Sequence, residues 1–276
     1  MNNRTEIQRI LQNQFPSLKD NTDKCGWLNE IVFDGVGFDP HKAAIKLGES
    51  LEPILHSVAK LRYAGGKLPR SVAGHGVSQQ EADNYYDRKY EIGQATNRNN
   101  AVPILTRLDP AKLSGFVAAR LETFYQKRKA TKSLRLDVKD FLKISNDGLA
   151  EIPLQDSIVE LSVDLCLLEK ELTLLEMKST FDTDAGKTEQ ELSKMIKAFI
   201  AVGNKPKQLL FGVISNNKGF KRNGEWCGRL GSFVSKELIL VESQLWDLLA
   251  PQDVSFDSFI NLFSTQYFLN LPKHKK

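Results

Sequence analysis

Three polar side chains on two neighbouring predicted strands have the residue types and spacing needed for hydrolytic chemistry. Asp164 lies in one apolar run, and Glu176 and Lys178 lie in the next. Two carboxylates that are close together repel each other unless a cation lies between them. Mg²⁺ suits such oxygen ligands, since it usually takes one or two carboxylates and keeps several waters. The metal and the lysine together would offset the charge that develops on a phosphodiester under in-line attack. The three residues are therefore suited to Mg²⁺-dependent phosphodiester hydrolysis. The alternative is a surface ion pair, and the expected position of these residues on adjacent strands, among apolar residues, favours the hydrolytic site.

A β-hairpin is the element expected to bring these residues together. From Val159 to Leu167 apolar and polar residues alternate, which is typical of a strand, and a second strand is expected over 172–178. A three-residue loop at 169–171 would place Asp164 opposite Glu176 and Ser162 opposite Lys178. Side chains that face each other across such a pair have Cβ atoms roughly 5 Å apart. A two-residue loop would instead turn Asp164 away, and Asp156 would then be the first carboxylate. Glu160 is expected on the same face as Asp164, as a candidate for a second metal.

The residues after the hairpin predict a mixed α/β core. Thr188 and Glu191 have the spacing of a capping box that begins a helix. A buried strand is expected at 208–215 and a further strand at 238–241. Helices at 243–249 and 255–269 follow. Together with the hairpin, these elements indicate a mixed central sheet flanked by helices.

The residues before the hairpin predict two different kinds of structure. The first 60 residues are mostly helical in pattern, with a break at 33–40, and an irregular polar stretch is expected from Tyr63 to about Arg107. That stretch is a solvated loop region or an arm that contacts DNA, for which Arg98 is a candidate. An amphipathic helix is expected from Pro110 to about Lys129. We therefore divide the chain into a mostly helical N-terminal region (1–109), with its long polar loop, and a catalytic core (110–276).

The end of that helix runs into the densest cluster of basic residues in the chain. The cluster lies between residues 127 and 135 and includes Lys127, Arg128 and Lys129. Such a cluster is either a solvated helix face or a surface that contacts phosphates. Its position shortly before Asp164 makes the phosphate contact a specific alternative.

Composition excludes several other classes of site and protein. Among 276 residues the three cysteines and four histidines are scattered, so a structural zinc site is not expected. The net charge of +4 is compatible with a nucleic-acid partner but does not require one. No apolar run is long enough to span a bilayer, and the N-terminus lacks the apolar core of a signal peptide. We therefore expect an intracellular protein with no membrane association.

The spacing around the three polar residues resembles a known nuclease motif. Val163-Asp164, eleven intervening residues and Glu176-Met177-Lys178 resemble the PD-(D/E)xK motif, with valine in place of the usual proline. The following segment, 178–187, contains an Asp-x-Asp (Asp182 and Asp184) and Lys187. It resembles the corresponding segment of type II restriction endonucleases of the TdeIII kind. The resemblance covers about residues 156–249, roughly a third of the chain.

This resemblance implies a fold, an activity and a set of roles. The fold would be a restriction-endonuclease-like core, and the activity would be site-specific cleavage of double-stranded DNA by a homodimer in a prokaryotic cytoplasm. Asp164 and Glu176 would bind Mg²⁺ with help from the Met177 carbonyl, Lys178 would position the attacking water, and Lys187 would contact a phosphate. The alternatives are another PD-(D/E)xK nuclease, for repair, recombination or mobile-element defence, and a non-catalytic DNA-binding protein.

Overall fold

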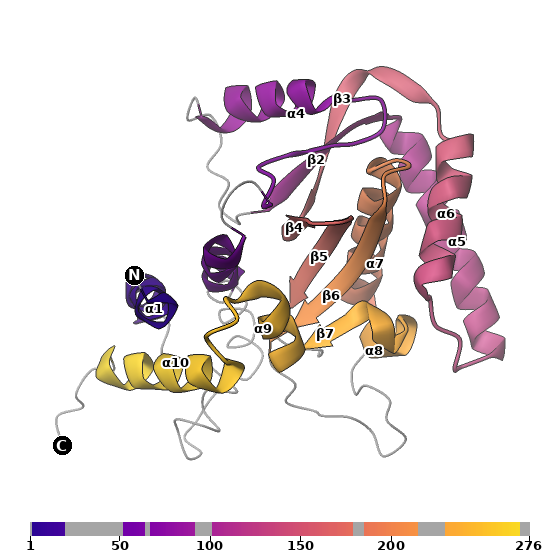
Figure 1. The fold of residues 1–276 in the computed structure, drawn as a ribbon. Coiled ribbons are helices and arrows are strands. Elements are labelled where there is room, and N and C mark those ends of the chain that lie inside the picture. The colour runs from indigo at the N-terminus through magenta and orange to yellow at the C-terminus, as the bar shows by residue number, and fades with distance from the viewer. Residues whose placement is uncertain are drawn as a thin grey trace.

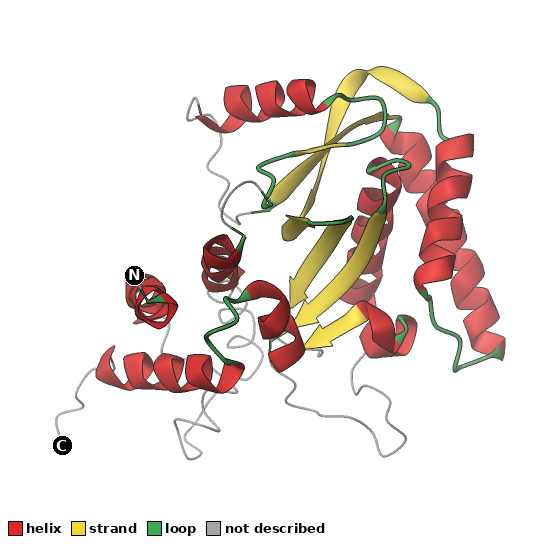
Figure 2. Cartoon of the chain, in the orientation of Figure 1, coloured by secondary structure: helices red, strands yellow, loops and turns green. Residues whose placement is uncertain are grey.

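Two mixed β-sheets flanked by helices form the centre of the described chain (Figure 1). The structure is a computed structural model that describes residues 2–19, 52–63, 67–91, 101–178, 185–214 and 230–270. Its helices are α1 (Asn3–Lys19), a helix over 52–62, α4 (Gln79–Tyr86) with a following π-helix (Asp87–Glu91), α5 (Pro110–Ala130), α6 (Val138–Glu151), α7 (Ala185–Ala201), α8 (Leu230–Phe233), a 3₁₀ turn (Lys236–Leu238), α9 (Ser243–Leu249) and α10 (Phe256–Asn270). Its strands are β1 (Val72–Ala73), β2 (Val102–Leu108), β3 (Leu154–Val163), β4 (Leu165–Leu168), β5 (Leu172–Lys178), β6 (Lys207–Val213) and β7 (Ile239–Val241). The expected α/β class is confirmed (Figure 2).

The two sheets differ in the order and pairing of their strands, and the chain passes from the first sheet to the second at Asp164. The first has the order β1-β2-β3, with β1 parallel to β2 and β2 antiparallel to β3. The second has the order β4-β5-β6-β7, in which β4 is antiparallel to β5 and the other neighbours are parallel. Parallel neighbours need a crossover connection, which α7 provides between β5 and β6. Asp164 is a bend between β3 and β4, so it lies where the chain passes from one sheet to the other.

The predicted hairpin register is confirmed, but the first strand is broken. Leu165 pairs with Leu175 and Leu168 with Leu172 around the loop 169–171, which is the register of the three-residue loop. The prediction of Ser162 opposite Lys178 is wrong, because β3 turns away at Asp164 and Ser162 pairs with Pro103 of β2. The sequence pattern did not reveal this bend, because apolar and polar residues alternate without interruption from β3 through Asp164 into β4.

Helices cover both faces of the second sheet. On one face Leu172 and Leu174 of β5 belong to a hydrophobic cluster that includes Leu192 and Met195 of α7. The helices α5 and α6 pack against α7 on its outer side (Figure 1). On the other face Leu175 and Met177 belong to a second cluster with buried residues of α1, the helix 52–62, α9 and α10. Every residue of β5 except Lys178 is therefore buried, and the faces alternate residue by residue.

The described parts of the stretch from Tyr63 to Arg107 are more ordered than its composition predicts. It contains β1, α4, the π-helix and most of β2, so the expectation of a continuous irregular stretch is wrong. Strand β2 was not predicted because it contains Pro103, and proline has no N–H to donate to a neighbouring strand. The pairing of β2 with β1 begins at the next residue, Ile104. Arg98 lies outside the described residues. Strand β2 ends at Leu108, just before the predicted domain boundary, and pairs with β3 beyond it.

Two aromatic residues in the first half of the last helix lie inside the protein. Phe259 and Phe263 of α10 are buried, and the Phe259 ring stacks on Trp246 of α9 with centroids 4.3 Å apart. On its other side α10 packs against α1. None of the described helices is both long and apolar enough to cross a membrane.

Candidate active site

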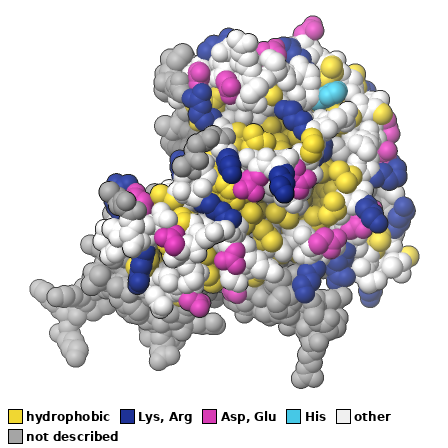
Figure 3. All heavy atoms as spheres, viewed as in Figure 1, with side chains coloured by type: hydrophobic (Ala, Val, Ile, Leu, Met, Phe, Trp, Pro, Cys, Tyr) yellow, Lys and Arg dark blue, Asp and Glu magenta, His cyan; other side chains and the backbone are white. Residues whose placement is uncertain are grey.

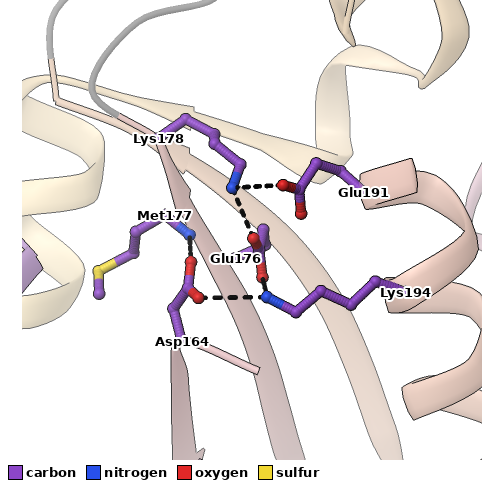
Figure 4. Close-up of polar contacts among 6 residues, drawn as sticks. All are labelled: Asp164, Glu176, Met177, Lys178, Glu191 and Lys194. Carbon is purple, nitrogen blue, oxygen red and sulfur yellow. Dashed lines mark hydrogen bonds and ion pairs between the residues drawn. The ribbon is translucent and has the colours of Figure 1, made fainter. Parts of the chain in front are cut away.

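Asp164 and Glu176 lie close together at the junction of the two sheets (Figure 4). Glu176 is on the α7 face of β5, and its side chain is only 1% exposed. Asp164 accepts a hydrogen bond at Oδ2 from the backbone N–H of Met177, with an N–O distance of 2.7 Å. This hydrogen bond is possible because the pairing of β4 with β5 ends at Leu165, which leaves the N–H of Met177 free of the ladder. The bend at Asp164 thus turns its carboxylate against the edge of β5.

Lys178 joins the same group of side chains. Its Nζ atom lies 2.6 Å from Oε1 of Glu176 and 3.0 Å from Oε1 of Glu191. Residues two apart on a strand share a face, which is why Glu176 and Lys178 both reach toward α7. The structure therefore brings together the three residues that the sequence selected for catalysis.

Two further members of the site come from α7 and were not predicted. Lys194 lies between the two carboxylates, with Nζ 3.3 Å from Oδ1 of Asp164 and 2.7 Å from Oε2 of Glu176 (Figure 4). Glu191, one turn earlier, binds Lys178. The predicted capping box of Thr188 and Glu191 is wrong, because α7 already includes Ala185 and Thr188 is inside the helix. A Glu and a Lys three residues apart also occur on solvated helix faces, so spacing alone could not identify them.

A fourth acidic residue, Glu52, approaches from the opposite side of the sheet. It begins the described part of the helix 52–62, whose residues Ile54, Leu55 and Val58 pack in the cluster opposite α7. The pKa of Glu52 is raised to about 7, first by burial and then by the negative charge of Asp164. The sequence carried no sign of this residue, because more than 100 positions separate it from the hairpin.

Burial controls the electrostatics of the site. The pKa of Asp164 is raised to about 6, first by burial and then by the neighbouring negative charge of Glu176. The pKa of Glu176 is also raised, by burial first, against the opposing effect of Lys178 and Lys194. Burial by itself lowers the pKa values of both lysines, but the adjacent carboxylates raise them above the ordinary value. The two ammonium groups are therefore protonated near neutral pH.

The donor set fits a hard divalent cation. Asp164, Glu176, Glu191 and Glu52 carry four negative charges when ionised, and the two lysines carry two positive charges, which leaves a formal excess of two negative charges. Within the described residues no three acidic, His or Cys side chains form a ready metal cluster. A cation on Asp164 and Glu176 would thus take its other ligands from backbone and water, as Mg²⁺ commonly does.

The backbone at Met177 is suited to supply one of those ligands. A strand residue directs its N–H and its C=O toward the same neighbouring strand. Because the Met177 N–H points to Asp164, the Met177 carbonyl also lies on that side of β5. Its place beside the carboxylate pair is compatible with the role that the nuclease resemblance implies.

The predicted basic cluster at the end of α5 separates into two kinds of residue. Arg128 donates hydrogen bonds to the carbonyls of Leu134 and Ser232, and Arg135 donates to the carbonyl of Gly231. These arginines connect the chain after α5 with α8. Lys127 and Lys129, by contrast, are exposed on α5.

The remaining candidates lie in different places. Lys187 is exposed near the start of α7. Glu160 binds Lys89 and the Tyr90 hydroxyl, each 2.6 Å from a carboxylate oxygen, rather than joining the site. Asp156 is exposed on β3. The predicted aspartates 182 and 184 lie outside the described residues.

Comparison of the chain with models of known protein families, with curated proteins and with solved structures found no match.

Proposed function

We propose that this protein is a Mg²⁺-dependent DNA endonuclease with a PD-(D/E)xK core, and in particular a type II restriction endonuclease. The observation that carries the proposal is the Asp164, Glu176 and Lys178 group on one hairpin, with a cationic group already placed between the two carboxylates. The mixed sheets with flanking helices are compatible with such a core. Residues 163–178 resemble the nuclease motif, and this resemblance is the reason for proposing DNA as the substrate.

Each residue of the group has a task in hydrolysis. Asp164, Glu176 and the Met177 carbonyl would hold Mg²⁺, which would polarise the scissile phosphate and promote ionisation of the attacking water. Lys178 is held by Glu176 and Glu191, so its ammonium has a defined position. Because the pKa of Lys178 is raised, this group donates hydrogen bonds and positive charge rather than accepting a proton. We assign it to orienting the water and stabilising the charge that develops on the phosphate.

DNA would be held by basic residues outside the catalytic group. Among the described residues on the face shown in Figure 3, acidic, basic and hydrophobic side chains are interspersed, so these residues form no single large basic area there that would mark the DNA path. Lys127, Lys129 and Lys187 are exposed candidates for phosphate contacts. We also propose a homodimer, because one catalytic group attacks one strand and a symmetric pair would match a palindromic site.

Cleavage of phage DNA in the presence of Mg²⁺ tests the activity. The expected result is a set of discrete fragments that Lys178→Ala does not produce, whereas Lys197→Ala, on α7, does. A smear or cleavage of branched DNA would favour a repair or recombination nuclease of the same superfamily. If the protein binds DNA equally well in EDTA and in Mg²⁺ and never nicks it, the proposal is refuted, and the remaining interpretation is a non-catalytic DNA-binding protein.

Sedimentation at micromolar concentration tests the assembly. We expect a dimer in complex with a DNA that contains the cleavage site. A monomer both alone and on DNA, with nicking of one strand as the only product, would exclude the homodimer.

A further inference from the structure

Lys194 has the position of a bound cation in the candidate site. Its Nζ atom contacts one oxygen of each carboxylate, Oδ1 of Asp164 and Oε2 of Glu176, at 3.3 and 2.7 Å. The other oxygens are already engaged, that of Asp164 by the Met177 N–H and that of Glu176 by Lys178. The two oxygens that face each other across the pair are thus bridged by an ammonium group.

A divalent cation bound to this pair would compete with that ammonium group. Two cations in one small, mostly buried site repel each other strongly, because the low local polarity screens their charges poorly. The Lys194 side chain is 34% exposed, whereas the Glu176 side chain is 1% exposed. The lysine therefore has access to solvent on one side and can leave, while the glutamate is fixed in the sheet.

We propose that Lys194 is the built-in counter-ion of the metal-free site and that a divalent cation displaces it from Asp164 and Glu176. The inference rests on the proposed function for the presence of a metal at this pair. Lys178 has a different place, because it contacts Glu191 and the far oxygen of Glu176, and it can stay when the metal binds.

Linkage gives this exchange a measurable consequence. Lys194 stabilises the folded protein only while no metal is bound, since it loses its partners when the metal takes them. The free energy by which Lys194 stabilises the metal-free protein is lost when the metal binds, so it weakens the binding free energy of the metal by the same amount. Removal of its charge should destabilise the metal-free protein and tighten metal binding together. An ion pair that persists with metal bound would have no such coupling.

Calorimetric titration with Mn²⁺, without DNA, measures the affinity directly. We expect Lys194→Met to bind Mn²⁺ more tightly than the wild type by roughly tenfold, which is within the usual range of coupling between two sites. Lys194→Gln, which keeps a hydrogen-bond donor but no charge, should show the same change. Lys197→Met is the matched control, since Lys197 lies on the same helix and makes no ion pair within the described residues. Its affinity should equal that of the wild type.

Thermal denaturation in EDTA and in saturating Mn²⁺ provides the second measurement. Lys194→Met should lower the midpoint in EDTA and leave it close to the wild-type value in Mn²⁺. Equal losses in both conditions, with unchanged or weaker Mn²⁺ binding, would show that Lys194 is a structural ion pair and would overturn the inference.

A failure of the inference can be distinguished from a failure of the proposed function. If the wild type binds Mn²⁺ and cleaves DNA but neither Lys194 variant binds more tightly, only the inference is wrong. If neither the wild type nor the Lys194 variants bind Mn²⁺, and DNA is not cleaved, both are wrong. Loss of the binding heat in Asp164→Asn would show that the titrated metal is at this carboxylate pair.

Discussion

Replacing Asp164 with asparagine is expected to make the metal-free protein more stable at neutral pH, although it removes a proposed catalytic residue. The carboxylate is nearly buried and lies beside Glu176, so its ionisation opposes folding. Asparagine has almost the same shape, carries no charge, and can still accept the hydrogen bond from the Met177 N–H. The substitution should therefore relieve a cost in stability that comes with the proposed catalytic role of this carboxylate.

The size and the pH range of the effect follow from the pKa of Asp164. That pKa rises from an ordinary 3.8 to about 6 on folding. Between these values the folded protein binds more protons than the unfolded chain, so the stability of the wild type falls as the pH rises. The cost is absent below the lower value and complete above the upper one. Each unit of pKa corresponds to about 1.4 kcal/mol, which gives a cost on the order of 3 kcal/mol.

Urea denaturation in EDTA between pH 4 and pH 8 measures this effect. The difference in unfolding free energy between Asp164→Asn and the wild type should be small at the acidic end and grow to its full size above pH 6. Taking the difference cancels the titration of groups elsewhere in the protein. The control is Asp156→Asn, because Asp156 is exposed on β3 and its charge should cost little. A variant that is less stable than the wild type at pH 7.5, or a difference that does not change with pH, would refute the reasoning.

Four further predictions concern charged groups in the site and at the end of α5. Glu176→Gln should lower plasmid cleavage by roughly a hundredfold or more without lowering the thermal midpoint in EDTA. Glu52→Gln should weaken Mn²⁺ binding in calorimetry by about threefold to tenfold, because it removes a partly exposed negative charge near the pair. Neutralising Lys127 and Lys129 together should reduce the steepness of the plot of log DNA affinity against log salt concentration by about 1.8, because each phosphate contact contributes about 0.9 to it. By contrast, Arg128→Ala should lower stability in urea, since its guanidinium joins the chain after α5 to Ser232.

The hairpin shows how far local sequence information reaches. Alternation of apolar and polar residues and a three-residue loop were sufficient to predict the pairing of Leu165 with Leu175. They were also sufficient to bring Asp164, Glu176 and Lys178 together, because the register of a hairpin depends only on its loop and on the face that is buried. The helix α5 was predicted from local information too, because its apolar residues recur with helical spacing, and the helices expected at 243–249 and 255–269 are also present.

Elements whose partners are distant in sequence were predicted less well. Strand β2 contains a proline and follows a polar stretch, so its pattern did not distinguish it from a loop. Its pairing with β3 connects residues about 50 positions apart, and nothing local encodes such a contact. The bend at Asp164 was missed for the same reason, because it depends on the pairing of β3 with the distant strand β2.

The sequence by itself predicted the α/β class from the patterns of successive elements. It predicted the hairpin register and the grouping of Asp164, Glu176 and Lys178 from one short segment. Only the tertiary structure decided what surrounds them. It placed Lys194 and Glu191 against the hairpin through the packing of α7, and Glu52 near it from the opposite face of the sheet. The charge balance of the site depends on distances between side chains from three separate segments. Those distances are set by the packing of helices on the two faces of the sheet.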